Sequence, residues 1–89
     1  LAFNDIQPVA PIHVLIVPKQ HIGSVKELDS ENASVLVNIH FAANKIAEKL
    51  GISEKGYRLI NNCGPDAGQT VPHLHYHLLG GTNLGPKII

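Results

Sequence analysis

Cysteine is scarce in this chain, which has one, Cys63, and tryptophan and methionine are absent. A single cysteine cannot form an internal disulfide, which argues against a secreted, cross-linked scaffold and makes a reducing cytoplasm the expected location. No apolar run approaches the roughly eighteen residues that a membrane span requires, and no secretory signal peptide precedes the first expected strand. We therefore expect a cytoplasmic protein that does not enter a membrane.

Charge of one sign is not in excess either, because seven Lys and Arg residues balance seven Asp and Glu residues. Nucleic-acid-binding domains usually carry a basic patch and a high pI, so this balance predicts no nucleic-acid partner. The hydrophobic content of 44% and charged content of 16% are typical of a folded protein. We expect residues 1–89 to form one domain with a modest core, which a partner subunit would stabilise.

Periodicity predicts one long helix among several strands. Strands are expected at 1–4, 13–17 and 56–61, and a short helical turn at 24–28. The helix is expected to start from a cap at Asp29 or Ser30, to run to Leu50 and to end at Gly51. Its apolar residues recur at steps of three and four: Leu36, Ile39, Ala43, Ile46, Ala47 and Leu50. The pattern predicts an α+β fold, an antiparallel β-sheet with one long α-helix packed on a face.

The segment HLHYHLL places His73, His75 and His77 on alternate positions. In a strand, alternate residues share a face, so the three imidazoles would face a surface or cleft while the apolar residues between them face the core. With six histidines in the chain, chance would produce this spacing about 0.03 times. The spacing alone therefore does not establish a function.

Metal binding, attack on a substrate and display to solvent are three possible uses of such a row. Along a strand, neighbouring imidazoles stand ~6.6 Å apart and the outer pair ~13 Å apart, so two can share a tetrahedral zinc but three cannot without strain. Cys63 is available as a ligand, yet no Cys-x-x-Cys or His-Glu-x-x-His completes a zinc set. Imidazole is also a competent nucleophile toward phosphorus near neutral pH. The spacing favours the nucleophile.

The loop before the histidines has the composition of an anion-binding loop. Gly64 and Gly68 allow the backbone to approach a ligand, and Asn62, Gln69 and Thr70 carry donors for phosphate oxygens. It is not a Walker loop, because no Gly-Lys-Ser/Thr follows. Glycine and asparagine are also ordinary turn residues, so a purely structural role stays open for them.

Two ordered motifs carry a resemblance. The sequence GQTVPHLHYHLLGG at 68–81 resembles the signature of the histidine triad (HIT) superfamily, and Ala-Pro-x-His-Val-Leu-Ile-Val-Pro-Lys at 10–19 resembles its nucleotide-binding branch more than its dinucleoside-triphosphate hydrolase branch. The likeness runs from residue 1 to about residue 81. It implies a HIT-like fold and a two-fold homodimer, and it identifies 1–89 as a HIT domain lacking the family's N-terminal segment.

The resemblance further implies a purine nucleoside phosphoramidate hydrolase or nucleotidyl transferase that needs no cofactor. His75 would attack the α-phosphorus, become nucleotidylated and then release AMP or GMP. His77 would contact the phosphate, and the carbonyl of His73 would fix the tautomer of His75. His13 matches a histidine that lies next to the triad in the family and supports it. The remaining nucleotide-binding positions implied are Phe3, Asp5, Ile6, Asn62, Gly68, Gln69 and Thr70.

Two other functions stay open: a nucleotide-binding or interaction module whose hydrolysis is incidental, and a dinucleoside polyphosphate hydrolase. Individual residues have plainer roles too, since Asp5 can cap the proline-rich turn and His13 can be a satisfied core histidine. His21 and His40 match no functional position and are expected at the surface.

A structural zinc ion is implied only by the resemblance. In some bacterial relatives an upstream Cys-x-x-Cys joins the counterparts of His13 and His73 on a structural zinc. We expect such an ion here only if an upstream cysteine pair exists, and no catalytic metal.

Overall fold

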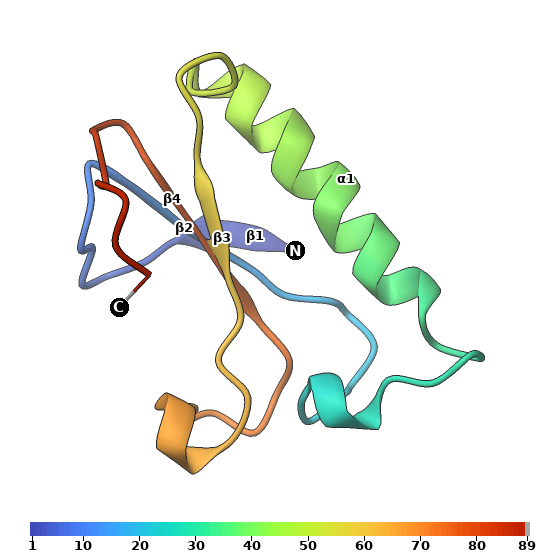
Figure 1. The fold of residues 1–89 in the computed structure, drawn as a ribbon. Coiled ribbons are helices and arrows are strands. Elements are labelled where there is room, and N and C mark those ends of the chain that lie inside the picture. Colours follow the sequence, from blue (N-terminus) through green and yellow to red (C-terminus); the bar gives the residue numbers. More distant parts are fainter. Residues whose placement is uncertain (89) are drawn as a thin grey trace.

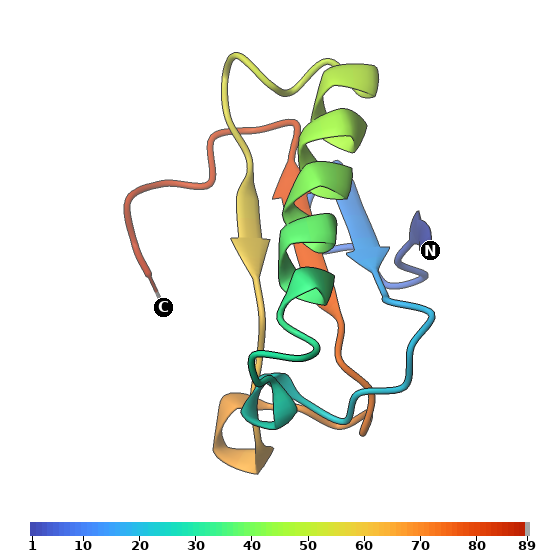
Figure 2. The same cartoon turned by 90° about the vertical axis from the view of Figure 1, so that its right-hand side faces the viewer.

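The computed structural model describes residues 1–88. Its four strands form one antiparallel sheet in the order β1-β2-β4-β3, and α1 lies across one face of that sheet (Figures 1 and 2). The predicted α+β architecture is confirmed. The elements are β1 (Ala2–Asn4), β2 (Ile12–Ile16), the 3-10 helix η1 (Val25–Glu27), α1 (Ser34–Lys49), β3 (Arg58–Ile60), the 3-10 helix η2 (Pro65–Ala67) and β4 (Tyr76–Gly80).

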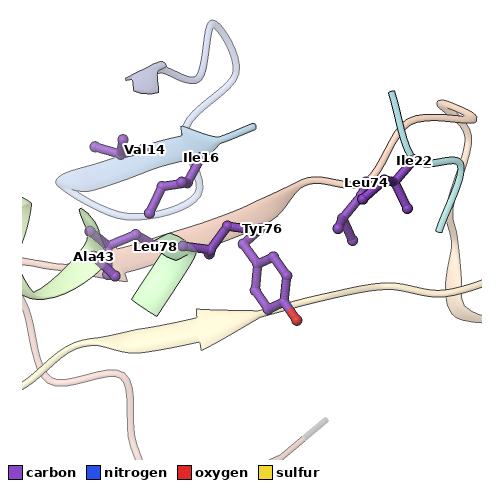
Figure 3. Packing of buried hydrophobic residues seen from close by; sticks show 8 residues of the cluster. Val14, Ile16, Ile22, Ala43, Leu74, Tyr76 and Leu78 are labelled. Atoms are coloured by element: carbon purple, nitrogen blue, oxygen red, sulfur yellow. The ribbon is translucent and has the colours of Figure 1, made fainter. Parts of the chain in front are cut away.

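The hydrophobic core lies between α1 and the two central strands, β2 and β4. Ile16 of β2 and Leu78 of β4 meet Ala43 of α1 there, and Figure 3 shows these side chains together. Leu74 and Leu78 are fully buried. From residue 73 to residue 78 buried apolar side chains alternate with half-buried histidines, so the predicted division of this segment into a core face and a histidine face is confirmed.

The helix α1 begins later than predicted. Its N-cap position is Ala33, which makes no side-chain cap, because the Asp29 carboxylate instead accepts the N–H groups of Glu31 and Asn32 in a separate turn before the helix. The C-terminal end is as predicted, since Gly51 has a φ of 75°, a conformation that favours glycine. Among residues 1–88 no helix has both the length and the hydropathy needed to cross a membrane.

The two paired strands β3 and β4 are shorter than the sequence pattern predicts. β3 covers Arg58–Ile60 within the predicted 56–61, and β4 begins only at Tyr76. The last ladder pairs are Ile16 with Tyr76 and Ile60 with His77, so His73 and His75 precede the paired part of β4. Before β4, the backbone bonds to a loop and not to a neighbouring strand, since the N–H of Leu74 donates to the Ile22 carbonyl.

The position of Leu78 in the sheet generates a stability prediction. Leu78→Ala should lower the free energy of unfolding by roughly 2–5 kcal/mol, because it leaves a cavity under α1. Urea denaturation followed by circular dichroism measures this. Val71→Ala is the control, since Val71 is 53% exposed and should change stability by no more than about 0.5 kcal/mol. Equal midpoints for the two variants would contradict this account of the core.

Candidate active site

The sheet face opposite α1 carries two buried or half-buried histidines. In the ladder between β2 and β4, Leu15 pairs with His77 and His13 with Leu79. Residues directly opposite one another share a face of the sheet, so both imidazoles lie on the side away from the helix. Phe3 of β1 pairs with Leu15 and therefore lies on this face, in line with His77.

His13 and His77 are in direct contact on that face. The Nε2 atom of His13 lies 2.9 Å from Nδ1 of His77, and the backbone N–H of Val9 donates to Nδ1 of His13 at 3.2 Å. Asp5 borders the pair, with Oδ2 3.5 Å from Nε2 of His13. Its Oδ1 accepts the N–H of Gln7 at 2.7 Å, so Asp5 both caps its turn and faces the histidines.

The ring of His75 is held by one backbone carbonyl, and the backbone of His75 is held by a side chain. Its Nδ1 lies 2.8 Å from the carbonyl oxygen of His73, the contact that the resemblance implies. A carbonyl oxygen only accepts, so Nδ1 carries the proton and Nε2 of the neutral ring keeps its lone pair. Asn61 donates from Nδ2 to the carbonyl of His75 at 3.0 Å. Reasoning from the sequence missed Asn61, although its place after a strand paired with the histidine segment is a usable signal.

The ring of His73 takes part in a different pair. Its Nε2 lies 3.1 Å from the carbonyl oxygen of Pro18, and its Nδ1 lies 3.1 Å from Nδ1 of His21. His21, to which the sequence assigned no function, thus contacts the triad. His40 is exposed on α1, as predicted.

The expectation that His13 and His73 stand together as zinc ligands is wrong. His13 is engaged with His77, and the neighbour of His73 is His21. Two ring nitrogens at this separation, one ring being held by a carbonyl, fit two of the four ligands of a tetrahedral zinc. A structural ion supported by an upstream cysteine pair would therefore bind to His21 and His73.

Gln69 holds the loop that precedes the histidines. Its Oε1 accepts the N–H of Gly64 at 2.9 Å, and its Nε2 donates to the carbonyls of Gly23 at 2.8 Å and Val71 at 3.0 Å. Its backbone N–H bonds to the Gly64 carbonyl at 3.1 Å. Every N–H donor of Gln69 is thus engaged within the protein, so the phosphate contact expected of this residue would require one of these hydrogen bonds to break.

The other loop residues divide between turn formation and free donors. Gly64 and Gly68 have φ values of 89° and 86°, which glycine adopts without strain, and the N–H of Gly68 bonds to the Pro65 carbonyl. Within residues 1–88 the side chains of Asn62 and Thr70 make no hydrogen bond, and Thr70 is exposed. These two residues therefore keep donors for a ligand. Ile6, in the loop after β1, is 95% exposed.

Electrostatics favour the neutral form of His77. Partial burial lowers the pKa of His77 below its ordinary value, and the positive charges that His13 and His75 carry when protonated lower it further. The Asp5 carboxylate acts in the opposite direction. Burial and the two neighbouring histidines therefore favour the neutral imidazole of His77, which offers a hydrogen bond from one ring nitrogen.

Curated relatives match the chain over most of its length. The purine nucleoside phosphoramidase of Escherichia coli (strain K12) is 48% identical over 87 residues, which cover 98% of this chain and 73% of that protein. An uncharacterized HIT-like protein of Buchnera aphidicola subsp. Baizongia pistaciae is 48% identical over 83 residues, 93% of this chain and 74% of that protein.

Solved structures share the fold. A HIT family hydrolase from Clostridium thermocellum superimposes with a TM-score of 0.96 at 67% identity, covering 99% of this chain and 76% of that one. A histidine triad protein from Clostridium difficile gives 0.92 at 48% identity, over 97% and 75%. The family model described as the HIT domain matches residues 1–84. The family model covers nearly the whole chain, and the histidine motif and the fold agree with it, so this chain belongs to the HIT domain family.

Proposed function

We propose that this protein is a purine nucleoside phosphoramidate hydrolase or nucleotidyl transferase that acts through His75 and releases AMP or GMP. The observation that carries the proposal is the hydrogen bond from Nδ1 of His75 to the His73 carbonyl, which leaves the Nε2 lone pair free for attack. The name of the E. coli relative, purine nucleoside phosphoramidase, supports the same substrate class. An imidazole nucleophile needs no cofactor for this chemistry.

The reaction has two displacement steps at the α-phosphorus. In the first, Nε2 of His75 bonds to phosphorus while the bond from phosphorus to the amine nitrogen breaks, and the amine takes a proton from solvent. In the second, water attacks phosphorus, the bond to His75 breaks, and a proton returns to solvent with release of the nucleoside monophosphate. His77 donates a hydrogen bond to a phosphate oxygen in both steps, where the charge of the transferring group is concentrated.

The nucleotide would lie along the sheet face that bears Phe3 and His77. The Asp5 carboxylate is the acceptor for the ribose hydroxyl groups, and the apolar side chains of Phe3 and Ile6 flank the base. Thr70 and Asn62 supply phosphate contacts, because their donors are free within the described residues, and Gly68 lets the loop backbone come close. Gln69 supports this loop from behind.

His75→Ala tests the nucleophile. We expect the release of AMP from adenosine 5′-phosphoramidate to fall by roughly a thousandfold or more, while calorimetry still detects AMP binding, since the ribose and phosphate contacts remain. His40→Ala is the matched control, because His40 is exposed on α1 and should keep full activity. In the wild type, quenching in denaturant should trap an AMP adduct on the peptide that contains His75.

Full turnover by His75→Ala would contradict the proposed reaction. Tight AMP binding by a wild type that hydrolyses phosphoramidate no faster than buffer would favour a binding module instead. Faster turnover of a diadenosine polyphosphate than of the phosphoramidate would favour the dinucleoside polyphosphate hydrolase.

Asp5→Asn tests the electrostatics of His77. The carboxylate favours the protonated imidazole, so its removal should lower the pKa of His77 below the value in the wild type, which itself lies below the ordinary histidine value. A titration of the ring signals of His77 by NMR measures both values. An unchanged or raised pKa in Asp5→Asn would show that the carboxylate does not act on this ring.

The two-fold homodimer implied by the resemblance is also part of the proposal. Val37 and Phe41 lie one helical turn apart on α1 and are 52% and 60% exposed, outside the stripe that packs on the sheet. Neighbouring exposed apolar side chains are typical of an interface. We place the partner subunit on this face of α1.

Phe41→Glu should convert the dimer to a monomer, because it would bury a carboxylate in an apolar contact. Light scattering after size-exclusion chromatography measures the mass. Ser53→Glu introduces the same charge at an exposed position beyond α1 and should remain dimeric. A wild type that is monomeric at micromolar concentration, or a dimeric Phe41→Glu, would contradict this interface.

A further inference from the structure

A chain of hydrogen bonds begins at the backbone of the loop between β1 and β2 and ends at the triad. The N–H of Val9 points at Nδ1 of His13 at 3.2 Å, and Nε2 of His13 points at Nδ1 of His77 at 2.9 Å. An amide N–H only donates, so Nδ1 of His13 accepts and the proton of the neutral ring lies on Nε2. That proton is donated to Nδ1 of His77, and the proton of His77 must then lie on Nε2.

We propose that the backbone N–H of Val9 is a positioning group that fixes the tautomers of His13 and His77, so that His77 presents Nε2–H to a phosphate oxygen of the substrate. The tautomers follow from the hydrogen bonds alone, whereas the use of Nε2–H rests on the proposed function. Within residues 1–88, Nε2 of His77 makes no hydrogen bond, so this donor is available to a ligand.

The opposite tautomers of His13 and His77 would be unfavourable at both ends of this series of hydrogen bonds. A proton on Nδ1 of His13 would face the N–H of Val9, donor against donor, and His13 is buried. Leaving such donors unpaired in a buried place is unfavourable. His77 would then have to donate from Nδ1, and its Nε2 lone pair would face the phosphate oxygens. The Val9 amide therefore decides whether His77 attracts or repels the transferring group.

The loop is built to hold this amide in place. Pro8 and Pro11 restrict the backbone on either side of Val9, and the N–H of Asp5 bonds to the His13 carbonyl at 2.9 Å. The side chain of Val9 is 76% exposed, so the contribution of this residue to the site is its backbone N–H.

The same hydrogen bond bears on a cluster that otherwise has the spacing of metal ligands. One ligand atom each from Asp5, His13 and His77 lies within 4.8 Å of the others. A metal needs an unprotonated ring nitrogen, but the Val9 amide keeps the proton of His13 on Nε2, the nitrogen that faces the cluster. The trio is thereby held as a hydrogen-bonded relay and loses one of its three ligands.

The first test uses the wild type without substrate. Long-range proton–nitrogen NMR spectra of the protein labelled with 15N-histidine, at a pH where the rings are neutral, report which nitrogen carries the proton. We expect both His13 and His77 to be protonated on Nε2 and unprotonated on Nδ1. A proton on Nδ1 of either ring would overturn the proposal, whether or not the protein hydrolyses phosphoramidates.

The second test compares two substitutions at one position. Val9→Ala keeps the N–H and should leave both tautomers and the turnover of adenosine 5′-phosphoramidate unchanged. Val9→Pro removes the N–H and should shift His13 toward the Nδ1–H tautomer. We expect a fall in kcat of roughly 10- to 100-fold, by analogy with the loss of a hydrogen-bond partner that orients a metal-bound histidine. Unchanged tautomers in a folded Val9→Pro, or an equal loss of kcat in Val9→Ala, would overturn the proposal.

If Val9→Pro does not fold, replacing the Val9 amide by an ester through semisynthesis removes the same N–H and keeps the side chain, and the same outcomes apply. The pH profile of the wild type provides a readout that a structural role would not move. Asp5, His13 and His75 are the titratable groups that face His77. A neutral His77 donor predicts that kcat stays level as pH rises above the pKa of His77, whereas a required imidazolium would cost about tenfold per pH unit and would overturn the proposed role.

Discussion

The burial of Leu74 and Leu78 is the constraint on which the site depends. Both side chains are fully buried, Leu78 at the centre of the sheet between Val14 and Leu59. Because side chains alternate along an extended segment, fixing these leucines in the core sends the intervening histidines to the other face. A slip of one residue would bury three imidazoles and expose the leucines, which makes the register energetically unambiguous.

The three histidines of the motif are equivalent in sequence and unequal in structure. His73 uses its ring on Pro18 and His21 and its carbonyl on His75. His75 is held through one nitrogen and is free at the other. His77 is joined to His13 and, through it, to the backbone of a loop far away in the sequence. Local spacing places the rings on one face, but distant hydrogen-bond partners assign each ring its direction.

Much of the fold could be predicted because its signals are local. The stripe of α1 and the alternation around Leu78 follow from short-range periodicity, and Gly51 marks the helix end. The start of α1 could not be read in the same way, because Asp29 suits a helix cap and a separate turn equally well. Leu50 illustrates a further limit: it continues the apolar stripe in sequence but is exposed at the helix end.

The site was predictable only in part for a similar reason. The resemblance supplied the contact between the His73 carbonyl and His75, and it brought His13 close to the triad. The pairing of His21 with His73 depends on how residues 18–22 pass the histidine segment, and no periodicity encodes that path. The role of Gln69 could not be predicted, because a side-chain amide can donate to a phosphate oxygen or to a loop carbonyl. Only the structure shows that both N–H groups of this amide already donate to loop carbonyls.

The bonds made by Gln69 have a consequence for the thermodynamics of binding. A loop that is tied to Gly23, Gly64 and Val71 by one side chain is already ordered before any nucleotide arrives. If a phosphate binds here, little binding free energy is lost in ordering the loop backbone, so a larger part of the interaction energy contributes to affinity. Under the proposed function, such a preorganised loop would bind the nucleotide phosphate in the same geometry whatever group is attached to the phosphorus.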